Sequence, residues 1–111
     1  MERWSQKFVA RFNGWRMNRT IHQRSSRIAR DVFPELCQSV RRKATPNHDR
    51  TEVAHYARSR ATQLCYSRVD QLVAQDRTIS GAVAAKIIAK SADRVVEMVF
   101  LEIWTLRRTV A

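Results

Sequence analysis

The stretch that most constrains the fold is residues 80–108, where apolar side chains recur with the period of an α-helix. With about 3.6 residues per turn, Lys86, Lys90, Asp93 and Glu97 face away from the apolar residues of this stretch. The apolar stripe consists of Ala84, Ile88, Val95, Val99 and Leu106, with Ala92 and Ile103 beside it. No other stretch is as long or as apolar, so we expect the rest of the chain to pack around this helix.

A second long helix precedes it. Asp49 can cap this helix, with Glu52 three residues later, and the pattern continues to about Gln75. Its stripe consists of Val53, Ala57, Ala61, Leu64, Cys65, Val69 and Leu72. Only residues 76–79 separate it from Ser80, the natural cap of the last helix, so the two helices must run antiparallel. We therefore predict a helical hairpin over residues 50–108.

The N-terminal third is helical in two registers. Trp4, Phe8, Phe12 and Trp15 share one face, and Met17, Ile21, Ile28 and Val32 share a nearly opposite face. We expect a break or kink between Asn13 and Thr20, near Gly14, and a packing role for the aromatic stripe. Pro34 fits the first turn of a separate short helix, with Leu36 and Val40 facing inward.

The expected fold is thus a small all-α bundle in a single domain, residues 1–111. It would consist of a basic helical arm (1–32), a short helix (34–43) and a long C-terminal antiparallel hairpin (50–108). Two glycines and two prolines leave little material for tight turns, as in an all-α chain.

Charge is the strongest indication of function. The chain carries 21 Lys and Arg against 10 Asp and Glu, and eight of the basic residues but only one acid lie in residues 1–30. Basic side chains that neutralise phosphates release counterions, which favours binding to nucleic acid without sequence readout. The candidate phosphate contacts are Arg3, Lys7, Arg11, Arg16, Arg19, Arg24, Arg27, Arg41, Arg42 and Lys43.

Other interpretations of the same charge stay open. The basic face could dock an acidic protein partner, as in an inhibitor, an adaptor or an assembly subunit. It could lie on an anionic membrane surface. Residues 41–43 could simply complement a helix dipole. An arginine-rich, acid-poor N-terminus is also typical of a mitochondrial transit peptide, a less favoured alternative.

A second apolar surface begins near the C-terminus. Phe100, Leu101 and Trp104 project on the side that is charged one turn earlier, so something must cover them. We expect either self-association into a homo-oligomer or an intramolecular cover by the N-terminal aromatic side chains. Two charged residues of the hairpin, Arg68 and Glu102, fall on apolar stripes. We expect Arg58 to pair with Glu102, and Arg68 to find a partner in the N-terminal segments or in a second chain.

The sequence offers little for catalysis, and we expect a non-enzymatic protein without a cofactor or metal. Cys37, His48, His55 and Cys65 match no usual zinc spacing. No glycine-rich phosphate loop or nucleophile motif occurs. Glu97 and Glu102 interrupt the most apolar stretch, which disfavours a membrane span. Two cysteines without a secretory segment favour a reducing, cytoplasmic location.

Overall fold

The protein is described by a computed structural model that gives the backbone of residues 2–44 and 49–110, and the side chains of residues 14–44 and 49–104. Three helices occupy almost all of these residues: α1 (Glu2–Lys43), α2 (Arg50–Gln75) and α3 (Gly81–Val110). No strand occurs among the described residues, and the three helices pack on one another. The predicted all-α fold class is therefore confirmed.

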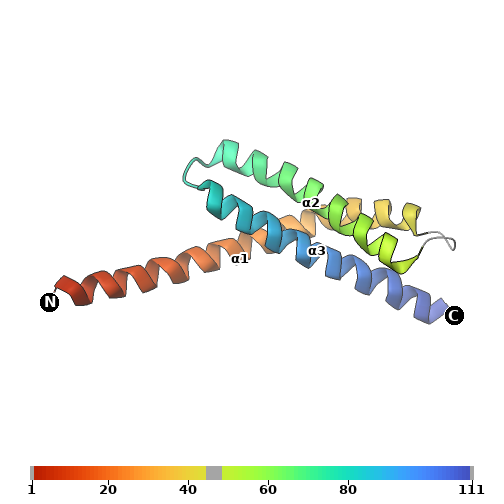
Figure 1. The fold of residues 1–111 in the computed structure, drawn as a ribbon, viewed down its shortest axis with the longest axis horizontal. Coiled ribbons are helices and arrows are strands. Elements are labelled where there is room, and N and C mark those ends of the chain that lie inside the picture. The colour runs from red at the N-terminus through yellow and green to blue at the C-terminus, as the bar shows by residue number, and fades with distance from the viewer. Residues whose placement is uncertain (1, 45–48, 111) are drawn as a thin grey trace.

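The molecule is elongated, with extents of 65 × 28 × 20 Å. The α2 and α3 helices run antiparallel, and α1 passes across both of them (Figure 1). The first part of α1 leads away from the other two helices, so the N-terminus and the end of α3 lie at opposite ends of the molecule (Figure 1). Among the described side chains of α1, the buried ones begin at Ile21, in the later part of the helix.

The α1 helix corrects two predictions about the N-terminal third. It runs without interruption from Glu2 to Lys43, so the break expected between Asn13 and Thr20 does not occur, and Pro34 lies inside the helix rather than starting a new one. A glycine costs a helix only about 1 kcal/mol and an interior proline about 3 kcal/mol. Burial of Val32, Leu36 and Val40 around the proline outweighs that cost, at about 1.5 to 3 kcal/mol for each large apolar side chain.

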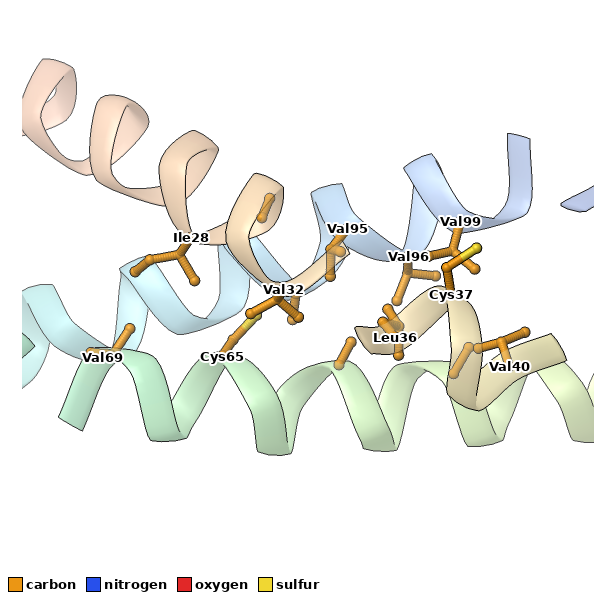
Figure 2. Packing of buried hydrophobic residues seen from close by; sticks show 14 of the residues in the cluster. Ile28, Val32, Leu36, Cys37, Val40, Cys65, Val69, Val95, Val96 and Val99 are labelled. Atoms are coloured by element: carbon orange, nitrogen blue, oxygen red, sulfur yellow. The ribbon is translucent and has the colours of Figure 1, made fainter. Parts of the chain in front are cut away.

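The core lies where the three helices meet, and each helix contributes rows of buried residues spaced four apart. Figure 2 shows Ile28, Val32, Leu36 and Val40 of α1 facing the other two helices. The buried row of α2 consists of Val53, Ala57, Ala61, Cys65 and Val69, and that of α3 of Ile87, Ser91, Val95, Val99 and Ile103. The small side chains in the buried row of α2 let both α1 and α3 lie close to α2. Buried rows with a spacing of four residues favour helices that cross at an angle.

The α3 stripe differs from its sequence prediction at its first half. Ile87 is fully buried, whereas Ile88, which the sequence pattern placed at the centre of the stripe, is only half-buried. The reason is that α3 packs against two helices at once, so its buried face is wider than one stripe and includes Val96 as well.

The turn between α2 and α3 is fixed by side-chain hydrogen bonds. The backbone N–H of Val83 donates to Ser80 Oγ at 3.2 Å, so Ser80 caps α3 as predicted. Asp76 accepts hydrogen bonds from the hydroxyl and the backbone N–H of Thr78. These bonds, with a smaller contribution from Arg24, hold the pKa of Asp76 below its usual value. Asp49, by contrast, makes no side-chain capping bond to α2.

Candidate nucleic-acid interface

The α1 helix concentrates the positive charge of the chain. Its 42 residues include eleven Lys or Arg and three acids, Glu2, Asp31 and Glu35. At about 1.5 Å of rise per residue, the basic residues extend over roughly 60 Å, nearly the whole length of the molecule. A charged row of this length is suited to an extended polyanion more than to a compact ligand.

The predicted phosphate contacts divide into three groups. The side chains of Arg3, Lys7 and Arg11 lie outside the described residues. Arg16, Arg19, Arg27, Arg41, Arg42 and Lys43 are exposed on α1. Arg24 is half-buried, and its guanidinium lies 3.2 Å from the Asp76 carboxylate, joining α1 to the turn after α2.

Ring contacts and ion pairs engage some of the exposed basic side chains but not others. The Arg19 guanidinium lies 5.6 Å from the Trp15 ring centroid, and Lys43 Nζ lies 5.5 Å from that of Tyr56. Arg27 and Arg42 make no ion pair, hydrogen bond or ring contact with the described part of the chain. The same holds for Arg30 and Arg41, so four arginines of α1 present fully available guanidinium groups.

Two grooves lie along the boundary between α1 and α2. The larger has a volume of about 670 Å³, and guanidinium groups reach it from both helices. Its lining residues are Thr20, Gln23, Arg24, Arg27, Ile28 and Asp31 of α1, and Arg68, Gln71, Leu72 and Gln75 of α2. We call it the arginine groove.

The second groove, of about 480 Å³, lies further along the same boundary. It is lined by Ser39, Arg42 and Lys43 of α1 and by Tyr56, Arg60 and Gln63 of α2. Between the grooves, Arg60 forms an ion pair with Glu35 at 3.6 Å. Residues 56, 60, 63, 71 and 75 of α2 share one helical face, so both grooves open on the same side of the α1–α2 pair.

Only part of the arginine groove could be predicted from the sequence. Arg24 and Arg27 were predicted contacts, and Arg68 was recognised only as an arginine on an apolar stripe. In the structure Arg68 is exposed beside the buried row of α2 and faces α1 across the groove, with no ion-pair partner in the described part of the chain. Its place in an apolar pattern was the signal, because a long arginine side chain can lie along apolar surface with its head in water.

The aromatic surface near the end of α3 is partly covered within the chain. The Phe100 and Trp104 rings stack with centroids 4.5 Å apart, and both rings pack against the core. The Arg50 guanidinium lies 5.2 Å from the Trp104 ring centroid. Leu101 remains 69% exposed.

Trp15, the one member of the N-terminal aromatic stripe whose side chain is described, does not provide that cover. The first part of α1 lies at the opposite end of the molecule from the end of α3 (Figure 1). Trp15 is 58% exposed, so its predicted packing role is wrong; the side chains of Trp4, Phe8 and Phe12 lie outside the described residues. The physical reason is the unbroken α1 helix, which keeps Trp15 on a different face from Ile21 and the rest of the buried stripe.

Other predicted features resolve simply. Glu102 and Arg58 are both exposed and form no ion pair with each other, so the expected buried pair is wrong. Cys37 and Cys65 are free and buried, and burial raises the pKa of the Cys65 thiol against an opposing hydrogen bond with Ser91. That thiol is protonated at neutral pH and is therefore a poor nucleophile.

His48 lies outside the described residues, and His55 is exposed. Within the described part of the chain, His, Cys, Asp and Glu side chains form no group of three or more that could hold a metal ion. None of the described helical segments has the length and apolar character required to span a membrane.

Comparison of the chain with protein-family models, curated proteins and solved structures finds no match.

Proposed function

We propose that this protein binds nucleic acid through phosphate contacts, with little dependence on base sequence. The supporting observation is the presence on α1, a helix about as long as the whole molecule, of four exposed arginines that make no ion pair with the described part of the chain: Arg27, Arg30, Arg41 and Arg42. Each guanidinium that neutralises a phosphate releases condensed counterions, which makes binding favourable at low salt and steeply weaker at high salt.

The arginine-rich composition supports phosphate recognition in particular. A guanidinium presents five N–H donors in a planar fork and can contact two phosphate oxygens at once. Arg30, Arg41 and Arg42 are exposed and make no ion pair, hydrogen bond or ring contact with the described part of the chain, so binding a phosphate requires no existing pair to break. We further propose a cytoplasmic location, on the basis of two free cysteines.

The test is a salt titration of binding to a labelled oligonucleotide, measured by fluorescence anisotropy. We expect a linear fall of log affinity with log salt, and similar affinities for unrelated sequences of equal length. The triple variant Arg30→Gln, Arg41→Gln, Arg42→Gln should make the slope shallower by about 2 for a single strand, since each lost phosphate contact contributes about 0.7.

The matched control removes the same charge from α3, through Lys86→Gln, Lys90→Gln and Arg94→Gln. All three residues are exposed and lie on a different helix. Equal losses in the two variants would show that only net charge matters and that α1 is not the interface. A wild-type protein that fails to bind at low salt would refute the proposed function.

A second candidate function is a protein-interaction module that docks an acidic partner protein. The specific observation in its favour is Leu101, which is 69% exposed beside the stacked Phe100 and Trp104 rings. A contiguous exposed apolar patch marks an interaction site, and in protein contacts a few buried side chains, often aromatic, supply most of the affinity.

A further inference from the structure

The arginine groove has features that the rest of the basic surface lacks. Arg30 and Arg41 of α1, by comparison, lie outside both α1–α2 grooves. Here Arg27 of α1 and Arg68 of α2 line the same concavity from opposite walls, and neither has an ion-pair partner in the described part of the chain. Two cations that share a groove repel each other, and an anion placed between them would relieve that repulsion.

The floor and the walls of the groove are suited to different parts of one ligand. Ile28 and Leu72 supply apolar surface, and three glutamines (Gln23, Gln71 and Gln75) bring side-chain amides to the same space. Each amide offers both hydrogen-bond donors and an acceptor, as the edges of bases require. Apolar surface beside the guanidinium groups displaces water and strengthens their attraction to a phosphate.

The third arginine of the groove is held in place. The ion pair between Arg24 and Asp76, at 3.2 Å, joins α1 to the turn after α2, and Thr78 orients the Asp76 carboxylate in turn. The pair therefore holds α1 against the turn after α2 at one end of the groove, while Arg27 and Arg68 stay available for a ligand. Asp31 is the one carboxylate that lines the groove, and it makes no ion pair with the described side chains.

On the premise that the protein binds nucleic acid, we propose that the arginine groove holds a single-stranded segment, with Arg27 and Arg68 contacting its phosphates from opposite walls. A volume of about 670 Å³ is that of a site for nucleotide-sized groups. A duplex carries its phosphates on the outside of a wide rod and could touch only the rims of such a groove. An unpaired strand can enter it and expose its bases to the amides and the apolar floor.

The position of the second groove suggests the path of the bound strand along the protein surface. It opens on the same side of the α1–α2 pair and offers Arg42 for a phosphate, while Lys43 Nζ lies 5.5 Å from the Tyr56 ring centroid. Residues 27 and 42 of α1 are separated by about 22 Å along the helix axis, a distance that a few unpaired nucleotides span. A strand along the α1–α2 boundary would thus contact both grooves.

The experiment compares a labelled oligothymidine with a hairpin duplex of equal phosphate number, by fluorescence anisotropy at fixed salt. The double variant Arg27→Gln, Arg68→Gln should weaken single-strand binding about tenfold or more and duplex binding clearly less. The control variant Arg30→Gln, Arg41→Gln removes equal charge outside both α1–α2 grooves and should weaken the two ligands to a similar, smaller extent. Thermal unfolding confirms that each variant is folded.

A gain-of-affinity variant guards against a result that reflects altered folding. Asp31→Asn removes the one carboxylate that lines the groove and should strengthen single-strand binding several-fold, with little change for the duplex. If the wild type binds the single strand but the groove and control variants lose affinity equally, the groove assignment is wrong and the proposed function stands. If the wild type binds neither ligand, both are refuted.

Discussion

The two adjacent isoleucines of α3 provide a sharp test of the packing. Ile87 is fully buried, and Ile88 is half-buried, although the sequence pattern favours Ile88 as the core residue. Replacing Ile87 with Ala removes three buried carbon groups, at about 0.8 kcal/mol each, and leaves a cavity that adds to the loss. We therefore expect Ile87→Ala to lower the free energy of unfolding by about 3 to 4 kcal/mol.

The Ile88→Ala variant is the matched control. That side chain is already partly in contact with water, and solvent can fill the space it leaves, so the expected loss is about 1 kcal/mol. Alanine's better helix propensity affects both variants equally and cancels in the comparison. The two variants should thus differ by about 2 kcal/mol.

Urea denaturation followed by far-UV circular dichroism measures this difference. With a dependence on urea of about 1 to 3 kcal/mol per molar for a small protein, the midpoints should lie roughly 1 M apart, Ile87→Ala being the lower. Equal midpoints, or a lower midpoint for Ile88→Ala, would mean that α3 packs in the register that the sequence pattern favours and would refute the structure's placement of this helix.

Four further predictions test other parts of the fold. Pro34→Ala should stabilise the protein by about 1 to 2 kcal/mol in urea denaturation, because an interior proline lacks the N–H that a helix uses; a helix that starts at Pro34 would give no gain. Ser80→Ala should cost about 1 kcal/mol in the same assay through loss of the α3 cap, and an unchanged midpoint would contradict the capping bond. Because the folded-state pKa of Asp76 is lowered, its stabilising effect is present at neutral pH and is lost as the pH falls through that pKa. The stability difference between wild type and Asp76→Asn should therefore shrink below about pH 4 in thermal unfolding, and a difference that persists in acid would rule out this carboxylate as its source. If Trp104 lies in a self-association surface, Trp104→Glu should shift a dimer to monomer in analytical ultracentrifugation, whereas a wild type that is monomeric at every concentration would exclude that surface.

Helix content, the positions of most buried residues and the α3 cap could all be predicted from sequence, because they depend on local chemistry. Ile21, Ile28 and Val32 recur with the helical period, and each is buried as expected. Ser80 precedes an apolar run and caps it. Such signals lie within a few residues of one another, so no knowledge of the rest of the chain is needed.

The sequence pattern misjudged the places where local preference and tertiary packing disagree. Gly14 and Pro34 are unfavourable in a helix, and local propensity therefore predicted interruptions near both. The α1 helix continues through both positions, and around Pro34 burial of Val32 and Leu36 against α2 and α3 exceeds the local cost. That balance depends on contacts between residues distant in sequence, which a local pattern does not contain.

The same division applies to the candidate site. The sequence alone determined that the N-terminal third is rich in arginine, because net charge and its distribution along the chain need no fold, and this charge is the basis for the proposal of a polyanionic ligand. Only the tertiary structure placed Arg68 of α2 opposite Arg27 of α1 and engaged Arg24 with Asp76. A groove is a relation between two surfaces, and helix packing brings those surfaces together from residues more than forty positions apart.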